Sequence, residues 1–389
     1  MKVITVFGTR PEAIKMAPVI KALEQSPYID SRVCITAQHR EMLDQVLEIF
    51  EITPDYDLNI MQQGQSLSDI TSKVLKAMEA VFDKENPDII LVHGDTSTTL
   101  SASMAAYYKK IPVAHIEAGL RTDDLYAPWP EEGNRRMVAA LSQLHFAPTQ
   151  NACDNLVAEN IPQDRIIVTG NTVIDALLSL TDKIDTNNTL NTTLKGQFEF
   201  LREDAKTVLI TGHRRENFGA GFHNICQAVA RLSHMFPEVD FVYPVHLNPN
   251  VSLPVRNLLS GISNVHLIQP LSYLPFVWLM KNSHLILTDS GGIQEEAPAL
   301  GKPVLVMREV TERPEALKAG TARLVGTHIE KIVFGAAELL TDEKTYMKMS
   351  KAVNPFGDGS AALRIVDTLE AYAGRDGEGN EHRAGLAAQ

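Results

Sequence analysis

The sequence has few cysteines and no long apolar run, and both absences narrow the class of protein. Three cysteines (Cys34, Cys153 and Cys226) are scattered over 389 residues without a pair motif. This pattern fits a reducing cytoplasm and argues against a disulfide framework or a thiolate zinc site. No apolar run approaches the ~20 residues that a membrane helix needs, and the first apolar segment is too short for a signal peptide. We therefore expect a cytoplasmic protein that has no membrane partner.

Positive charge is also scarce. Lysine and arginine number 36 against 48 aspartates and glutamates, which gives a formal net charge of −12. Nucleic acids and anionic membranes are poor partners for such a surface, so an anionic substrate would need a local basic pocket. Hydrophobic residues make up 44% and charged residues 22% of the chain, as in ordinary globular proteins, and the length suits two domains.

The common cofactor motifs are missing. No G-x-G-x-x-G follows the first apolar strand, and Gly301-Lys302 lacks the other residues of a phosphate-binding Walker loop. There is no nucleophile elbow, and the histidines at 93 and 115 lack metal-ligand spacing. We predict that the protein uses neither a metal nor another cofactor, and that its chemistry depends on carboxylates, imidazole and cations.

Short apolar runs alternate with amphipathic segments in both halves of the chain. This alternation is typical of parallel sheets covered by helices on both faces, and we predict an α/β protein with two Rossmann-like domains. The predicted strands are 2–7, 32–37, 88–93, 112–117, 144–148 and 165–170, followed by 206–212, 239–245, 264–269, 284–289 and 302–307. The clearest helical patterns are 11–25, 66–84, 97–109, 131–142, 328–340, 344–352 and 359–373.

The domain division follows from where this pattern restarts. We assign residues 1–170 to an N-terminal domain and 171–359 to a C-terminal domain, with the boundary marked by the polar, β-poor segment 182–197. The helix at about 360–373 has two possible places, as a cap on the second half or crossing back to the first. The Gly- and charge-rich tail 374–389 is expected to be disordered.

Basic residues follow several of the predicted strands, where ligands bind in doubly wound folds. Arg10 lies in the turn after the first strand and Lys15 one turn into the next helix, an arrangement that suits a diphosphate. A solvated helix start with Pro11 at its first position is the alternative. His213 ends a strand beside two arginines, which favours a phosphate contact over a purely structural histidine.

Carboxylates follow other strands of the first half. Asp95 is a candidate catalytic acid or metal ligand, or simply a helix cap. Glu117 stands between an apolar strand and a glycine turn, where burial would suit an acid/base role. Glu131 and Glu132 begin a helix, and carboxylates are common there because of the helix dipole.

A glycine-rich loop in the second half resembles an anion cradle. Ser290, Gly291 and Gly292 open a helix after an apolar strand, so backbone amides there can face a phosphate. Glu295 and Glu296 follow in the first turns, where carboxylates beside a phosphate are unexpected. Arg313 precedes a second Arg-Pro-Glu-Ala turn, like that of Arg10, and the two turns suggest paired anion clamps.

The order of the longer motifs identifies a family resemblance over about residues 1–373. The motifs are "VFGTRPEAIKMAP", "TAQHREMLDQVL", "VHGDT", "HIEAGLRT", "WPEEGNR", "GNTVIDAL", "TGHRREN", "YPVHLNPNV" and "LTDSGGIQEEAP". With them the chain resembles the bacterial non-hydrolysing UDP-N-acetylglucosamine 2-epimerases. The resemblance implies the GT-B architecture, in which two Rossmann-like domains face a central cleft. It also implies a homodimer that interconverts UDP-N-acetylglucosamine and UDP-N-acetylmannosamine for cell-surface polysaccharide, without metal or NAD.

The resemblance also implies roles for individual residues. Asp95, Glu117 and Glu131 would supply the acid/base groups, with His213 beside the reacting diphosphate, while the face of C2 served by each acid stays open. A second molecule of UDP-N-acetylglucosamine would act as an activator near Gln38. The residues expected to bind the nucleotide are Arg10, Lys15, His213 and Arg313 for the diphosphate, Ser290, Gly291 and Gly292 for phosphate through their amides, Glu296 for the ribose, Phe276 for the uracil, and Leu271 through its backbone only.

Three other functions are compatible with the same residues. A hydrolysing relative would release free N-acetylmannosamine and UDP from the same site. A non-catalytic module that only binds a nucleotide sugar is less consistent with three acids at strand ends, because an anion gains little from them. A GT-B glycosyltransferase is possible on fold alone, since fold does not fix function.

Overall fold

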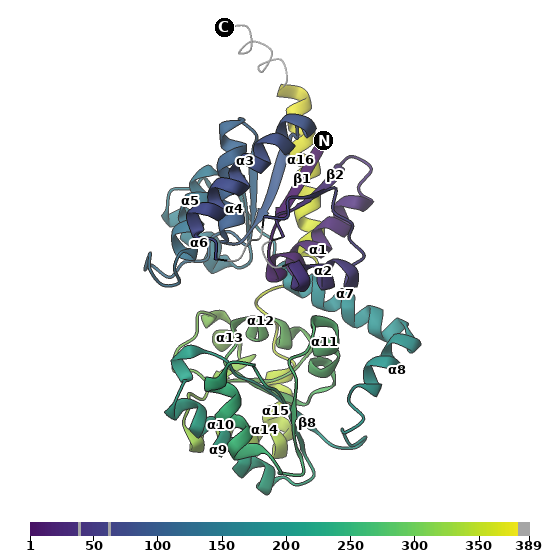
Figure 1. The fold of residues 1–389 in the computed structure, drawn as a ribbon, viewed down its shortest axis with the longest axis vertical. Coiled ribbons are helices and arrows are strands. Elements are labelled where there is room, and N and C mark those ends of the chain that lie inside the picture. The colour runs from purple at the N-terminus through teal and green to yellow at the C-terminus, as the bar shows by residue number, and fades with distance from the viewer. Residues whose placement is uncertain (38–39, 61–63, 380–389) are drawn as a thin grey trace. The chain divides into compact units, whose positions relative to one another are not determined.

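The computed structural model describes residues 1–37, 40–60 and 64–379, which form two compact units (Figure 1). The N-terminal unit comprises Met1–Ala176 together with the C-terminal segment that starts at Gly357, and the C-terminal unit comprises Leu177–Phe356. No helix in these residues is both long and apolar enough to cross a membrane.

The N-terminal unit is built on a seven-stranded parallel sheet with the order β3-β2-β1-β4-β5-β6-β7. Its central strands are continuous apolar runs because both faces are covered by helices. The strands are β1 (Lys2–Phe7), β2 (Asp30–Ile35), β3 (Tyr56–Asp57), β4 (Ile89–His93), β5 (Val113–Ile116), β6 (Leu144–Ala147) and β7 (Ile166–Val168). The helices are α1 (Arg10–Gln25), α2 (Arg40–Ile49), α3 (Leu67–Glu85), α4 (Ser97–Tyr108), α5 (Glu131–Leu141), α6 (Gln150–Ala158), α7 (Thr172–Thr186), which continues into the other unit, and α16 (Ala361–Gly379).

The C-terminal unit repeats this plan with a six-stranded parallel sheet in the order β10-β9-β8-β11-β12-β13. One apolar core joins its strands to α9, α10 and α14. The strands are β8 (Thr207–Thr211), β9 (Asp240–Pro244), β10 (Val265–Ile268), β11 (Leu285–Thr288), β12 (Val304–Val306) and β13 (Ala322–Leu324). The helices are α8 (Asn188–Gly196), α9 (Ala220–Met235), α10 (Pro249–Leu259), α11 (Tyr273–Asn282), α12 (Gly291–Ala299), α13 (Pro314–Ala319), α14 (Ile329–Thr341) and α15 (Glu343–Ser350).

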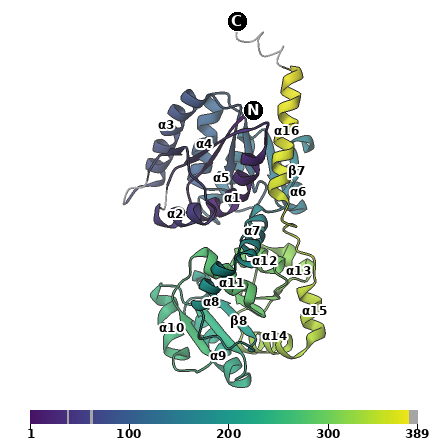
Figure 2. The same cartoon turned by 90° about the vertical axis from the view of Figure 1, so that its right-hand side faces the viewer.

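Helix α16 belongs to the N-terminal unit, which settles the place of the last predicted helix (Figure 2). It packs against α1, and its apolar residues at helical spacing, among them Ile365 and Leu369, are buried. The Asp175 carboxylate accepts a hydrogen bond of 2.8 Å from the Ala362 amide, and Ser26 donates one of 2.5 Å to Glu370. The N-terminal unit is therefore discontinuous in sequence.

The predicted fold class of two Rossmann-like parallel-sheet domains is confirmed, with differences at short elements. Strands β3 and β13 were not predicted, because two or three residues are too few to show an apolar pattern. The units divide within α7, after Ala176, and not in the polar segment 182–197. Most of that segment is helical, in the end of α7 and in α8. Ile184 of α7, four residues after the buried Leu180, and Leu194 of α8 are buried, while most of the polar residues face solvent.

Candidate active site

Each unit has one point where the strand order reverses, and predicted site residues follow the two strands on either side of it. In the N-terminal unit these neighbours are β1 and β4, which lead into Arg10 and Asp95. In the C-terminal unit they are β8 and β11, which lead into His213 and Ser290. Doubly wound sheets bind ligands at this position, outside the carboxyl ends of the strands.

Glu117 lies directly after β5 and makes an ion pair with Lys15 of α1. The same carboxylate oxygen accepts a hydrogen bond of 3.1 Å from the Asn171 side chain and lies 3.8 Å from Nε2 of His93. The backbone of Glu117 has a φ of +61°, a left-handed conformation that costs about 1–2 kcal/mol for a residue with a Cβ. Such strain concentrates at functional sites, and here it turns the carboxylate toward the lysine.

Two buried histidines lie close to the turns that carry these acids. His115 is buried on β5, and its Nε2 donates a hydrogen bond of 2.7 Å to the carbonyl of Gly94, the residue before Asp95. His93 is buried at the end of β4, and neither of its ring nitrogens is hydrogen-bonded within the described residues. Burial lowers the pKa of His93 to about 4 and that of His115 to about 3, so both imidazoles are neutral at pH 7.

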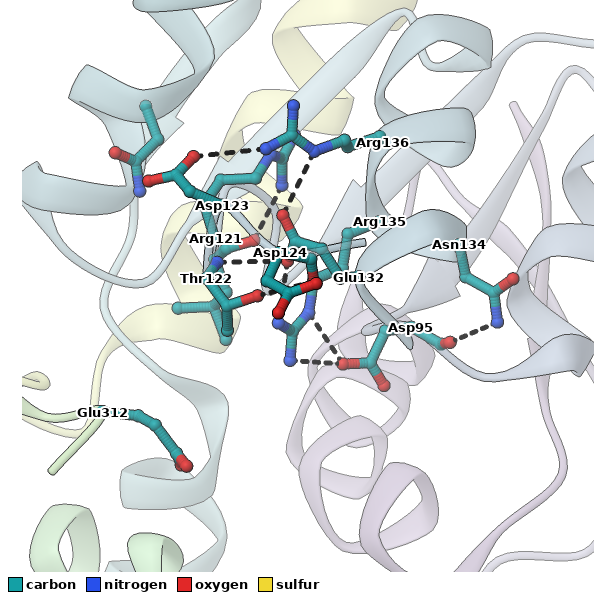
Figure 3. Close-up of polar contacts among 12 residues, drawn as sticks. Asp95, Arg121, Thr122, Asp123, Asp124, Glu132, Asn134, Arg135, Arg136 and Glu312 are labelled. Carbon is teal, nitrogen blue, oxygen red and sulfur yellow. Dashed lines mark hydrogen bonds and ion pairs between the residues drawn. The ribbon is translucent and has the colours of Figure 1, made fainter. Parts of the chain in front are cut away.

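Asp95 is not the cap of the helix that follows it, which removes one of its predicted roles. The N-cap of α4 is Thr96, whose side chain accepts a hydrogen bond from the Thr99 amide. The Asp95 carboxylate is instead held by Arg135 of α5, with Nε 2.9 Å and Nη2 2.7 Å from its Oδ2 atom (Figure 3). The Asn134 side chain donates to the Asp95 carbonyl at 2.8 Å.

The two acids at the start of α5 differ sharply in burial. Glu131, the predicted acid/base residue, is half-buried as the first residue of the helix. Glu132 is fully buried and accepts hydrogen bonds from Arg135, Arg136 and the Thr122 amide (Figure 3). The residue pattern identified both only as acids of a helix start, the family resemblance gave an acid/base role to Glu131 alone, and Arg135 was not identified at all.

Glu12 is a second buried acid that was not predicted. Its Oε2 atom accepts from the amides of Gly8 (3.1 Å) and Thr9 (2.7 Å), and its Oε1 atom accepts from the hydroxyls of Thr96 (2.7 Å) and Thr99 (3.2 Å). Burial raises the pKa of Glu12, although these hydrogen bonds act to lower it. The residue ties the turn before Arg10, the first residue of α1, to the turn after Asp95. The capping box S/T-x-x-E at 9–12 was the available signal.

The glycine loop of the C-terminal unit is shaped by a buried aspartate. Asp289 accepts hydrogen bonds from the amides of His213 (2.9 Å to Oδ2) and Arg214 (2.9 Å) and from the side chain of Asn217 (3.2 Å). Ser290 is the N-cap of α12, whose first residue is Gly291. The loops after β8 and β11 are therefore held together, with the helix N-terminus beside His213.

Charged side chains surround this helix N-terminus. Arg313 forms an ion pair with the buried Glu295, which agrees with a structural role for that acid. A Cβ placed on Gly291 would lie 3.9 Å from Nη2 of Arg313 and 3.7 Å from Nη2 of Arg214, so two guanidinium groups border the loop. Glu296 accepts a hydrogen bond of 3.2 Å from the Tyr273 hydroxyl.

A pocket of about 480 Å³ opens beside His213. The imidazoles of His213 and His246 stack with their centroids 5.7 Å apart, and Arg214 and Phe218 also line the pocket. Burial lowers the pKa of His213, against the opposing effect of the Asp289 carboxylate.

Three further predictions concern single positions or a ligand class. Leu271 and Phe276 are half-buried, Leu271 just before α11 and Phe276 within it. Gln38 lies outside the residues that the structure describes. In the described parts of the chain no three His, Cys, Asp or Glu side chains are grouped so that they could hold a metal ion.

Two doubly wound parallel-sheet units, each with charged residues at its switch point, define a two-domain Rossmann-like α/β protein. The chain belongs to the UDP-N-acetylglucosamine 2-epimerase family, whose model matches residues 21–370. The UDP-N-acetylglucosamine 2-epimerase of Salmonella typhimurium is 59% identical over 372 residues, which cover 96% of this chain and 99% of that protein. The predicted family is thereby confirmed.

Solved structures of relatives have the same fold. The UDP-GlcNAc 2-epimerase of Neisseria meningitidis, solved bound to UDP-GlcNAc, is 56% identical with a TM-score of 0.87, covering 95% of this chain and 100% of that one. The enzyme of Methanocaldococcus jannaschii, solved in complex with UDP-GlcNAc and UDP, is 34% identical with a TM-score of 0.77 and the same two coverages.

Proposed function

We propose that the protein catalyses reversible epimerisation at C2 of UDP-N-acetylglucosamine, giving UDP-N-acetylmannosamine. Family membership supports the reaction, and the acids of the N-terminal unit support the chemistry. The observation that carries most weight is the Glu117–Lys15 pair, in which a strained backbone aims a carboxylate at a cation beside Asn171. A protein that only bound an anion would gain nothing from this arrangement.

Simple deprotonation at C2 is not feasible at neutral pH, because C2 is not adjacent to a carbonyl group. The proposed route is therefore elimination. Departure of UDP from C1 creates positive character at the anomeric carbon and helps the C2 proton to leave. The products are a 2-acetamidoglucal and UDP, both of which must stay bound. Re-addition of UDP to C1, with delivery of a proton to the opposite face of C2, completes the inversion.

The proposed roles of the residues differ by the charge that each group handles. Asp95, Glu117 and Glu131 are proposed to exchange protons with the two faces of C2, or to stabilise charge beside it. His213 and Arg313 are proposed to stabilise the departing diphosphate, together with Arg10 and Lys15 of the first unit.

The nucleoside is proposed to bind to the C-terminal unit. The amides of residues 290–292 suit a phosphate at the N-terminus of α12. Glu296, one turn further along, suits the ribose hydroxyls, and the region of Leu271 and Phe276 suits the uracil. Gln38 is proposed to contact a second, activating molecule of substrate. Strictly hyperbolic kinetics, with no stimulation of the reverse reaction by trace UDP-N-acetylglucosamine, would exclude that activation.

The deciding experiment is incubation with UDP-N-acetylglucosamine in heavy water followed by NMR. Elimination and re-addition must place deuterium at C2 of the product, whereas retention of the original hydrogen would exclude the proposed route. The same spectra separate epimerisation from hydrolysis, because a hydrolysing enzyme would accumulate free N-acetylmannosamine and UDP. A module that only binds nucleotide sugars would leave the substrate unchanged.

Glu117→Gln tests the acid/base assignment. Loss of a general acid or base lowers turnover by about 10²–10⁴-fold. This loss should exceed any change in the dissociation constant for UDP, which Glu117 can affect only through its ion pair with Lys15. Glu24→Gln is the matched control, since Glu24 is an exposed carboxylate on α1 and should leave turnover unchanged. Unchanged turnover in Glu117→Gln would remove this residue from the mechanism.

We also propose a cytoplasmic homodimer that supplies N-acetylmannosamine units for cell-surface polysaccharide. The scattered buried cysteines support the cytoplasmic setting, and the dimer and the polysaccharide role follow from the family resemblance. Light scattering tests the dimer, and a monomer at micromolar concentration would contradict it.

A further inference from the structure

We propose that Arg135 is a positioning residue for Asp95: it fixes one carboxylate oxygen and leaves the other facing the substrate. The inference rests on the proposed function, in which Asp95 is an acid/base group. Arg135 does not itself touch the reacting atoms in this proposal. It acts only through the orientation of the aspartate.

In the contact between the two side chains, two nitrogens of the arginine share one oxygen of the aspartate. Nε of Arg135 lies 2.9 Å and Nη2 lies 2.7 Å from the same oxygen, Oδ2 of Asp95. Within the described residues no hydrogen bond reaches Oδ1. A fork-to-fork pair, with each nitrogen on its own oxygen, is the arrangement that recurs where an arginine simply binds a carboxylate. The contact seen here, with both nitrogens on Oδ2, instead leaves Oδ1 for proton transfer.

The arginine is itself anchored on a buried acid. Nη1 of Arg135 donates a hydrogen bond of 3.2 Å to Oε2 of Glu132, whose side chain is 0% exposed. The other oxygen of Glu132 accepts 3.1 Å from Nε of Arg136. An arginine held between a buried acid and Asp95 has little freedom to rotate, so the position of Asp95 is defined by the helix and not by solvent (Figure 3).

Helix α5 also holds the backbone of Asp95. The Asn134 side chain donates 2.8 Å to the Asp95 carbonyl, and Asn134 is buried. Main chain and side chain of the aspartate are therefore fixed by neighbouring residues of one helix. Glu132 and Arg135 are three residues apart, which places both on the same face.

A fixed aspartate matters because proton transfer depends on distance and direction. A displacement of about 1 Å at a catalytic group costs about 10²-fold in rate. Without the guanidinium, the Asp95 side chain, which is 24% exposed, can rotate toward solvent or toward another cation. The proposal therefore predicts a loss in kcat that exceeds any change in nucleotide affinity.

The test compares Arg135→Gln and Arg135→Lys with Arg136→Gln. Arg136 is the matched control, because it is the next residue on α5 and contacts Glu132 but not Asp95. Arg135→Gln should lower kcat by about 10- to 100-fold, with the UDP dissociation constant measured by calorimetry within about twofold. Arg135→Lys keeps one cationic donor and should recover part of the loss. Arg136→Gln should stay within about twofold of wild type.

A double-mutant cycle decides whether Arg135 acts through Asp95. In an Asp95→Asn background, Arg135→Gln should lower kcat by less than about twofold more, because there is no carboxylate left to position. An unchanged penalty in that background would overturn the proposal, as would full activity of Arg135→Gln in the wild-type background. Circular dichroism confirms folding, and Arg135→Lys carries the same test if Arg135→Gln does not fold.

Failure of the proposed function gives a different result. If the wild-type enzyme places no deuterium at C2 in heavy water, the proposed function and the role of Arg135 both fail. If the wild-type enzyme exchanges deuterium and Arg135→Gln exchanges it equally fast, only the positioning role fails.

Discussion

Three buried histidines lie on adjacent strands of the N-terminal sheet, and they predict that this unit is sensitive to mild acid. His93, His115 and His145 belong to β4, β5 and β6, and His115 and His145 are register partners. Burial lowers their pKa values from 6.5 to about 4, about 3 and about 4, respectively. The folded unit therefore binds fewer protons than the unfolded chain as the pH falls below 6.5, and its stability must fall with it.

The size of the effect follows from the number of protons involved. Each histidine that stays neutral in the folded state while its unfolded counterpart is protonated costs about 1.4 kcal/mol per pH unit. Between pH 6.5 and pH 5 this amounts to about 2 kcal/mol for each residue and about 6 kcal/mol for three. Domains are typically stable by about 5–15 kcal/mol, so we expect the N-terminal unit to lose much of its stability by pH 5.

Amide hydrogen exchange followed by mass spectrometry measures this unit separately, because each peptide is assigned to one unit. After correction for the intrinsic pH dependence of exchange, the free energy of opening for peptides from β4 to β6 should fall steadily from pH 6.5 to pH 5. His145→Leu replaces one of the three imidazoles by an apolar side chain of similar size. It should therefore reduce this slope by about one third.

Phe146→Leu is the matched control, since Phe146 is the buried neighbour of His145 on β6. It should lower stability by about 0.5–3 kcal/mol at every pH and leave the slope unchanged. A wild-type slope equal to that of His145→Leu would refute the reasoning. So would opening free energies that do not change between pH 6.5 and pH 5.

Three further substitutions test the buried acids and one glycine. Glu12→Ala leaves two backbone amides without an acceptor and should lower the free energy of unfolding, measured by thermal unfolding, by about 2–4 kcal/mol. Glu24→Ala, at an exposed position of the same helix, is the control and should lower it by less than about 0.5 kcal/mol. Gly119→Ala should destabilise the N-terminal unit strongly, because its φ is +90° and the new Cβ would lie 2.2 Å from the Ala152 carbonyl oxygen; normal exchange protection of β5 and β6 would contradict this. Asp289→Ala removes the acceptor for three donors and should lower the free energy of unfolding of the C-terminal unit by about 3–5 kcal/mol. It should also weaken UDP binding in calorimetry, and an unaltered affinity would show that this loop is not part of the nucleotide site.

The regular part of the fold was predictable from local pattern. Strand β1 has the predicted bounds, since a continuous apolar run with charged or glycine neighbours leaves little choice. Strands β3 and β13 depend on pairing with β2 and β12 and have almost no pattern of their own. Helix α7 was not predicted although its apolar residues recur at helical spacing, and only its last residues, 182–186, lie in the polar segment.

The candidate site was predictable where one residue type at a strand end suffices. Glu117 and Asp95 were found in this way. The pairing of Arg135 with Asp95 and the burial of Glu132 could not be predicted in this way. The dipole of α5 already explains two acids at its start, and only tertiary packing decides that Glu132 is more buried than Glu131. Glu12 was missed for a related reason: its hydroxyl partners, Thr96 and Thr99, are more than eighty positions away in the sequence.

The discontinuity of the N-terminal unit has a consequence for how the protein is made. All seven strands of its sheet leave the ribosome before α16, and 180 residues of the other unit, Leu177–Phe356, separate them. At about 5–20 residues per second this delay lasts roughly 10–40 s. Throughout it, the apolar surface of α1 against which α16 later packs has no covering helix. The first unit to begin folding is therefore the last to be completed, and a nascent chain that stalls within the second unit leaves this apolar surface open to aggregation or chaperones.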